Sequence, residues 1–498
     1  MRVLFCTSEA VPFAKTGGLA DVSGALPPAL AAAGCDVRVV LPRYGSVPLS
    51  DLRRAGSVEG QVAGTPLSGT MYEGRLPAGD VPVWLVDRPD YFDRPALYGE
   101  EGRDYPDNLA RFTFFTRAVL AWAAAQAWQP DVIHCHDWQA ALIPAIIAAG
   151  QAAPAATVLT IHNLAYQGLF PAAEFPVTGL PPSLFTMTGM EFWGQVNVLK
   201  GGLVFATLLS TVSETYAKEI QTPEYGAGLD GVLRDRRADL FGILNGVDYR
   251  AWDPAVDPLI PARYSTADLR GKADCKRALQ EEFGLRADPR APVIGMVTRL
   301  VDQKGLDLVA AAIDEFLAAG AQFVLLGTGE PVYHQRFADF AASHQDQVGV
   351  RLGFDNRLAH WIEAGADMFL MPSRYEPSGL NQLYSLRYGT VPVVRRTGGL
   401  ADSIIDATPA ALADGTANGF VFDDATPAAL LAAVRRALAA FADPAVWARI
   451  VGAGMRADFS WAKAAAQYRR LYELAVSRQP RTAHSGSVRG TPLPGGRG

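Results

Sequence analysis

Short apolar runs alternate with longer amphipathic stretches along the first half of the chain. Two helix-like segments, from Leu19 to Ala33 and from about Asn108 to Ala127, lie between apolar runs. Strands separated by helices of about ten residues or more are typical of βαβ units and a parallel sheet. The pattern predicts a Rossmann-like domain whose strands are Val3 to Cys6, Val37 to Leu41, Val81 to Val86, Val132 to Cys135 and Thr157 to Ile161.

The same alternation begins again after the proline-rich stretch from Asp253 to Pro261. A helix is expected after Lys304, between strands at Val293 to Val297, Phe323 to Leu326, Met368 to Met371 and Val391 to Val394. We therefore expect an α/β protein with two Rossmann-like domains, residues 1–250 and 251–459. Two such domains imply a cleft between them, and ligands bind beyond the carboxyl ends of strands in such sheets, so we expect the functional residues in the loops there.

The end of the chain has a different pattern. The amphipathic stretch from Trp461 to Val476 predicts a helix, within residues 460–477, that packs back on the N-terminal domain. Residues 478–498 are rich in Ser, Thr, Gly, Pro and Arg and predict a disordered tail. Hinges are expected near residues 247–261 and just before residue 460.

Composition narrows the class of protein. A chain of 498 residues is too long for a single hydrophobic core, which predicts more than one domain. Its 49% hydrophobic residues predict a globular chain. A net charge of −6 gives no global basic field, so no nucleic-acid partner is expected. We expect no membrane span and no signal peptide, hence a cytoplasmic protein. The cysteines lack disulfide or CxxC spacing and are interpreted as reduced structural thiols: Cys6, Cys35, Cys135 and Cys275.

A glycine pair follows the first predicted strand, in the string KTGGLAD. Gly17 and Gly18 open a helix, where exposed N–H groups favour an anion, and Lys15 adds a full charge. This predicts a diphosphate site; the simpler alternative is a turn with a solvated lysine. The string recurs as RTGGLAD at 396–402, again just before a helix, which supports duplication.

Two loops of the second half carry further candidates. Arg299 and Lys304 follow a strand, and two cations there would neutralise a departing diphosphate, although surface solvation is the usual role. Glu376 precedes the helix that begins near Asn381 and would accept hydrogen bonds from sugar hydroxyls, or simply stabilise that helix end. Phe354 follows a strand and would stack on a purine, unless it is an ordinary core residue.

Histidines end two strands of the first half, in the strings HCHDWQ and TIHN. The HxHD spacing invites a metal site, but no further ligand completes a set. We therefore interpret His134 and His136 as core or positioning residues and expect no metal.

Together these strings resemble the family of bacterial glycogen synthases and plant starch synthases, which has the GT-B glycosyltransferase fold. The resemblance runs from Arg2 to about Val476. It is carried by KTGGLADV, HCHDWQ, TIHNLAYQG, ILNGVD, TRLVDQKG, SRYEPSGLNQLYSLRYG and RRTGGLADS.

The resemblance implies roles for individual residues. It places Glu9, Tyr98 and Asn163, with Asp137, on the acceptor side. It places His162 and Asp137 at the reacting glucose, with Asp21 and Asn245. The implied ADP-glucose site also includes Lys15, Gly17, Gly18, Arg299, Lys304, Phe354, Glu376, Ser378, Gly379, Leu380 and Asn381.

Three positions depart from some relatives. Tyr384 stands where UDP-sugar enzymes of this fold have a second glutamate, Ser378 where some relatives have cysteine, and Phe354 where some have tyrosine. A thiol can therefore have no role at Ser378, nor a phenol at Phe354, while backbone contacts at both positions are expected to survive.

The resemblance implies retaining transfer of glucose from ADP-glucose to the non-reducing end of an α-1,4-glucan, with neither metal nor cofactor. A covalent route would need a carboxylate at C1; we favour attack on the face that the nucleotide leaves, steadied by the main-chain carbonyl of His162. The alternatives are a UDP-glucose-dependent GT-B glucosyltransferase and a non-catalytic glucan-binding relative. A glycogen phosphorylase would need a far longer chain and a pyridoxal-phosphate lysine.

Overall fold

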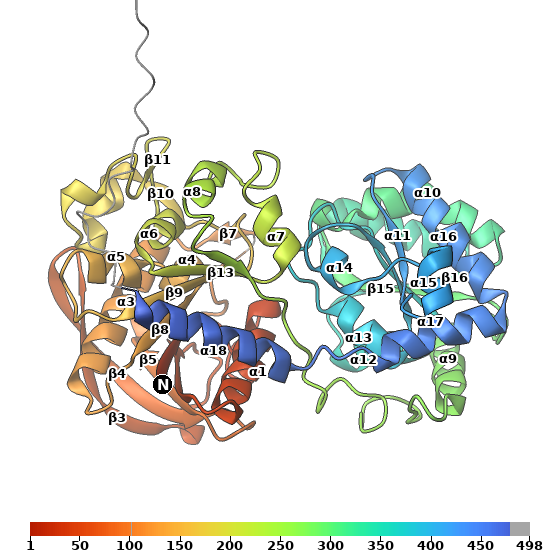
Figure 1. The fold of residues 1–498 in the computed structure, drawn as a ribbon, viewed down its shortest axis with the longest axis horizontal. Coiled ribbons are helices and arrows are strands. Elements are labelled where there is room, and N and C mark those ends of the chain that lie inside the picture. The colour runs from red at the N-terminus through yellow and green to blue at the C-terminus, as the bar shows by residue number, and fades with distance from the viewer. Residues whose placement is uncertain (101, 479–498) are drawn as a thin grey trace, which may run out of the picture. The chain divides into compact units, whose positions relative to one another are not determined.

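The computed structural model describes residues 1–100 and 102–478. These residues form two compact units, each built around its own sheet (Figure 1). Unit 1 comprises Met1–Val212, Ala217–Ile243 and the C-terminal segment from Trp461. Unit 2 comprises Ser213–Tyr216 and Leu244–Ser460. The tail predicted for 478–498 lies, beyond Arg478, outside the described residues.

Unit 1 has a mixed sheet with the strand order β14-β13-β9-β8-β1-β2-β5-β4-β3, in which β3 and β4 are antiparallel. Its strands are β1 (Arg2–Cys6), β2 (Asp36–Pro42), β3 (Arg53–Val62), β4 (Thr65–Arg75), β5 (Pro82–Asp87), β8 (Val132–His136), β9 (Ala156–Ile161), β13 (Leu208–Thr211) and β14 (Leu240–Gly242). A small separate sheet has the order β10-β12-β11, with β10 (Leu169–Pro171), β11 (Glu191–Phe192) and β12 (Gln195–Asn197). A short hairpin is made of β6 (Gly99–Glu100) and β7 (Arg103–Asp104).

The helices of unit 1 cover its sheet because their apolar faces pack against the buried strands. They are α1 (Gly18–Ala32), α2 (Pro89–Phe92), α3 (Asn108–Ala125), α4 (Asp137–Ala140), α5 (Leu142–Ala148), α6 (Val198–Phe205), α8 (Asp230–Asp235) and α18 (Trp461–Ser477); α7 (Glu214–Glu219) spans the boundary of the units. Helix α18 packs against α1 and buries Trp461, Tyr468 and Tyr472 in the core of unit 1.

Unit 2 has a parallel sheet with the order β17-β16-β15-β18-β19-β20. Its strands are β15 (Val293–Leu300), β16 (Gln322–Gly329), β17 (Val348–Leu352), β18 (Met368–Met371), β19 (Val391–Arg395) and β20 (Phe420–Phe422). Its helices are α9 (Arg270–Glu282), α10 (Leu306–Ala318), α11 (Pro331–Ser343), α12 (Asn356–Gly365), α13 (Asn381–Tyr388), α14 (Gly398–Ser403), α15 (Pro409–Asp414), α16 (Pro427–Phe441) and α17 (Pro444–Arg456).

The predicted strands of both halves are confirmed, and so is the α/β class. The antiparallel pair β3–β4 was not predicted, because its sequence lacks an apolar run. Gly60 and Gly69 of this pair lie against the ring of Phe114, where a Cβ atom would approach within 2.7 and 2.8 Å. All four cysteines are buried and free. Among the described residues no helix is both long and apolar enough to cross a membrane.

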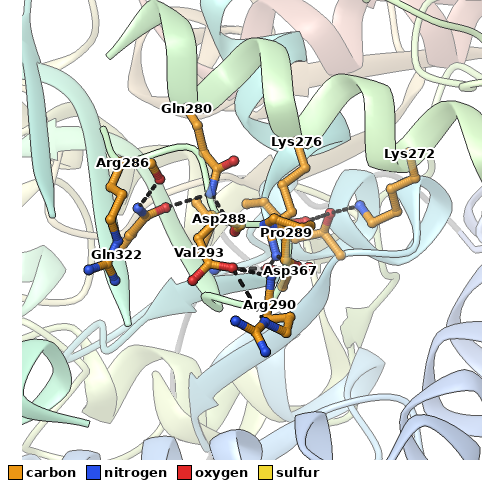
Figure 2. Close-up of polar contacts among 12 residues, drawn as sticks. Lys272, Lys276, Gln280, Arg286, Asp288, Pro289, Arg290, Val293, Gln322 and Asp367 are labelled. Carbon is orange, nitrogen blue, oxygen red and sulfur yellow. Dashed lines mark hydrogen bonds and ion pairs between the residues drawn. The ribbon is translucent and has the colours of Figure 1, made fainter. Parts of the chain in front are cut away.

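A buried polar network ties α9 to the amino-terminal edge of the unit 2 sheet (Figure 2). Lys276 forms an ion pair with Asp367 at 2.7 Å, and Asp367 accepts the main-chain N–H of Val293 at 2.8 Å. Gln280 donates to Gln322 at 2.8 Å, which links α9 to β16. These contacts hold α9 to the strands at this edge, whereas ligands of such sheets bind beyond the opposite, carboxyl-terminal edge.

Replacing Lys276 with Met should lower the free energy of unfolding by about 3 kcal/mol, because Asp367 would keep a buried charge without its partner. Urea denaturation measures this change. Arg277→Ala is the matched control on the same helix: it removes an exposed ion pair with Asp274, and we expect a loss below about 0.5 kcal/mol. Equal losses in the two variants would contradict the prediction.

Candidate functional site

The sequence-predicted residues of unit 1 gather at the carboxyl ends of β1, β8 and β9. Glu9 follows β1 and is buried. Its carboxylate accepts hydrogen bonds from the main-chain N–H of Thr16 (2.5 Å), the hydroxyl of Thr16 (2.6 Å), the N–H of Gly17 (3.2 Å) and the hydroxyl of Tyr98 (2.7 Å). Two of the acceptor-side candidates, Glu9 and Tyr98, are therefore in contact, and Glu9 holds the KTGG turn in place.

The KTGG turn is open on its outer side. Gly17 precedes α1 in an extended conformation, and no atom lies within 4 Å of the position that a Cβ would take. Lys15 lies beside it and forms a 2.7 Å ion pair with Asp21, in which both side chains are partly exposed. A lysine, a helix N-terminus and open space together suit an anionic group.

Asp137 links β8 to α4 with a φ of 54°, in the left-handed region that residues other than glycine seldom adopt. Its carboxylate accepts the main-chain N–H of His162 at 2.7 Å and the N–H of Asn163. Burial raises the pKa of Asp137 to about 7, although these two N–H groups oppose the change. The carboxyl group of Asp137 is therefore held by two main-chain donors, and a substantial fraction of it is protonated at neutral pH.

The N–H of Asn163 and the carbonyl of His162 belong to the same peptide group. Since the N–H points to Asp137, the planarity of the peptide directs the carbonyl oxygen of His162 away from that carboxylate. Burial also lowers the pKa of the His162 ring to about 3, so the imidazole is neutral and is no proton donor near neutral pH. The polar group of His162 that this geometry orients is therefore its main-chain carbonyl.

The histidines of HCHDWQ have structural partners. The Nδ1 atom of His134 lies 2.7 Å from the hydroxyl of Tyr472 on α18, and its Nε2 lies 2.6 Å from that of Thr160. His136 Nδ1 lies 2.9 Å from Nε2 of His162. Burial lowers the pKa of both His134 and His136. Within residues 1–100 and 102–478, no group of three or more His, Cys, Asp or Glu side chains could hold a metal ion.

In unit 2, Lys304 and Glu376 form a buried ion pair. Their Nζ and Oε2 atoms are 2.6 Å apart, and the hydroxyl of Ser373 donates to the same Oε2 at 2.9 Å. Lys304 lies in a 3₁₀ turn, η4 (Asp302–Lys304), after β15, while Glu376 follows β18. These two strands are neighbours in the parallel sheet, so their carboxyl ends bring the two residues together.

Glycines of the RTGGLAD string form the wall of the Glu376 loop. A Cβ on Gly398 would lie 1.9 Å from the carbonyl oxygen of Glu376, and one on Gly399 would lie 1.9 Å from that of Ser378. The glycine pairs were predicted just before a helix; in the structure Gly18 begins α1, and Gly398 and Gly399 are the first two residues of α14. Gly17 faces open space, whereas Gly398 and Gly399 allow two backbones to touch.

The remaining donor candidates of unit 2 differ in exposure. Phe354 is 79% exposed, which excludes the core alternative, and Arg299 is exposed at the end of β15. The side-chain amide of Asn381 donates to the carbonyl of Val297 at 2.7 Å. Among the donor candidates, Oγ of Ser378 and Oδ1 of Asn245 are buried without a hydrogen-bond partner in the described residues. Gly379 has a φ of 63°, and Leu380 is the residue just before α13.

Sequence reasoning missed three polar residues that complete these clusters. Thr16 binds Glu9 twice, Ser8 lies 2.7 Å from the hydroxyl of Tyr98, and Ser373 binds Glu376. Individual Ser and Thr residues are so common in loops that no sequence pattern distinguishes those that belong to a site. The one signal that could have identified these three residues is their position beside or within the motif strings.

Comparisons with known proteins agree with this geometry. Residues 2–235 match the starch synthase catalytic domain, and residues 279–448 match the glycosyl transferases group 1 family. A glycogen synthase of Syntrophotalea carbinolica is 50% identical over 96% of this chain and 99% of its own length. A glycogen synthase of Anaeromyxobacter dehalogenans is 53% identical over 95% of this chain and 98% of its own.

A solved structure has the same fold. The catalytic domain of starch synthase IV from Arabidopsis thaliana, bound to ADP and acarbose, aligns with a TM-score of 0.88 and 36% identity. The alignment covers 96% of this chain and 99% of that one. Matches at this identity over nearly the whole length of both chains show common ancestry. This chain therefore belongs to the family of bacterial glycogen synthases and plant starch synthases, which are glycosyltransferases of the GT-B fold.

Proposed function

We propose that the chain transfers glucose from ADP-glucose to the non-reducing end of an α-1,4-glucan, with retention of configuration and release of ADP. The observation that carries this proposal is the buried Lys304–Glu376 pair beside the unpartnered hydroxyl of Ser378. A carboxylate accepts hydrogen bonds from sugar hydroxyls, and an ammonium group neutralises a phosphate. The ADP in the structure of starch synthase IV supports the choice of nucleotide.

The proposed donor site uses three cations. Lys304 and Arg299 follow the same strand and would neutralise the diphosphate as the glycosidic bond breaks. Lys15, beside the open KTGG turn of unit 1, would add a third charge. Phe354 is exposed at the end of β17 and would stack on adenine. Because side chains supply this charge, we propose that neither a metal ion nor a cofactor is needed.

The proposed acceptor residues are Glu9, Tyr98, Asp137 and Asn163. Glu9 and Tyr98 share a hydrogen bond, and Asp137 is held by the backbone of the residues after β9. A partly protonated Asp137, engaged by two N–H groups, is a poor candidate for covalent attack at C1. We therefore propose same-face attack, in which the departing phosphate takes the acceptor proton and the carbonyl of His162 steadies the positive anomeric carbon.

The function is tested by measuring nucleotide release from ADP-glucose and from UDP-glucose, each with and without glycogen, in buffer that contains EDTA. We expect glycogen-dependent release of ADP and a much slower reaction with UDP-glucose, with the α-anomer in the product by NMR. Faster turnover of UDP-glucose would favour the alternative donor. Glycogen binding without turnover of either donor would indicate a non-catalytic relative.

Replacing Lys304 with Gln should lower kcat about 100-fold or more, because one charge that stabilises the leaving diphosphate is lost. The KM for glycogen should stay unchanged, since this residue is proposed for the donor. Arg435→Gln, which breaks an exposed ion pair with Glu315, is the control and should leave kcat unchanged. A loss in kcat of less than about twofold in the Lys304 variant would exclude the proposed role.

Asp137→Asn should change the pH dependence of stability. The folded pKa of Asp137, about 7, lies above the ordinary value of 3.8, so the folded state binds more protons between these values. The wild type should therefore lose stability relative to Asp137→Asn as the pH rises from about 4 to about 7, by up to ~1.4 kcal/mol per pH unit. Urea unfolding across this range measures the difference. A difference that does not vary with pH would contradict the assignment.

A further inference from the structure

Trp193 is the most exposed of the large hydrophobic side chains in the described structure, at 85%. With Gly194 it forms the two-residue turn between β11 (Glu191–Phe192) and β12 (Gln195–Asn197). Both turn residues are left-handed, with φ values of 50° and 77°. Such turns favour Asn-Gly or Asp-Gly, because a bulky side chain strains the first position. Neither local conformation nor burial explains a tryptophan here.

The base of this turn is firmly held. The N–H of Gly194 donates to Oε1 of Glu191 at 2.7 Å, and the ammonium group of Lys200 donates to the carbonyl of Glu191 at 2.5 Å. Gly228 packs against Phe192, where a Cβ would approach the ring within 2.8 Å. The indole therefore projects into solvent from a backbone that is already ordered. Binding to it costs little conformational entropy.

The small sheet that carries Trp193 is attached to the loops that hold Asp137 and His162. Its strand β10 (Leu169–Pro171) pairs with β12 and begins soon after β9 (Figure 1). Trp138 packs on Phe170 of β10, with ring centroids 5.7 Å apart. Tyr166 is 54% exposed in the connecting loop. Exposed rings thus recur along the segment that leads from Asn163 to Trp193.

We propose that Trp193 is a stacking platform for an α-1,4-glucan, at a subsite beyond the acceptor residues at the carboxyl ends of β8 and β9. This inference rests on the proposed function, which makes a long glucan the acceptor. The CH face of a pyranose ring is apolar, which suits stacking on the exposed indole ring. Gln195, two residues after Trp193, is also exposed, and its side-chain amide offers a hydrogen-bonding group.

Trp193→Asn tests the proposal, because asparagine suits the left-handed turn and should preserve or raise the melting temperature. The apparent KM for glycogen should rise about tenfold, equivalent to ~1.4 kcal/mol. The KM for maltotriose, kcat and the KM for the nucleotide sugar should not change, because a short acceptor does not reach the platform. Trp193→Phe should retain part of the glycogen affinity. Val332→Ser, at a 62% exposed apolar residue of α11, is the control.

An unchanged KM for glycogen in Trp193→Asn, with an active wild type, would overturn the platform and leave the proposed function intact. Equal increases for maltotriose and glycogen would also overturn it, because they would indicate a general disturbance of the acceptor site. A change in oligomeric state with unaltered glucan kinetics would assign Trp193 to a protein contact instead. Absence of turnover in the wild type would count against the proposed function itself.

Discussion

The unit 2 site depends on the contact between two backbones, at Gly398 and Gly399 on one side and Glu376 and Ser378 on the other. No side chain fits between them, since an added Cβ would lie 1.9 Å from a carbonyl oxygen. This contact fixes the loop after β18, and with it the carboxylate that pairs with Lys304. A charged pair can be buried there because its geometry is imposed by the main chain and completed by Ser373.

Unit 1 buries two carboxyl groups near the ends of its strands, those of Glu9 and Asp137. Glu9 is satisfied by the N–H groups of a helix-opening turn and by Tyr98. Asp137 has main-chain donors from the next strand's loop, and burial raises its pKa to about 7. The carboxylate of Glu9 holds the KTGG turn, and that of Asp137 orients the peptide group between His162 and Asn163. Neither is presented as a free nucleophile, which favours a mechanism based on charge neutralisation and positioning.

Two exposed aromatic residues are the remaining candidates in the two proposals. Phe354 and Trp193 are 79% and 85% exposed, and each follows a strand or joins two strands. A planar ring exposed on ordered backbone can stack on a flat or apolar face of a ligand. In the proposed reaction one ring serves the nucleotide and the other serves the glucan.

The α/β class, the parallel strands and the strings that carry the site could be predicted from the sequence, because apolar runs and glycine turns are local signals. The sequence could not predict β3–β4, whose strands have no apolar run and pack against α3, where Gly60 and Gly69 leave room for Phe114. Only the tertiary structure decided which polar groups meet: Thr16 with Glu9, Ser373 with Glu376, and Tyr472 with His134 across 338 positions of the chain. Such pairs depend on distance in space and on burial, and neither is encoded in the spacing of residues along the chain.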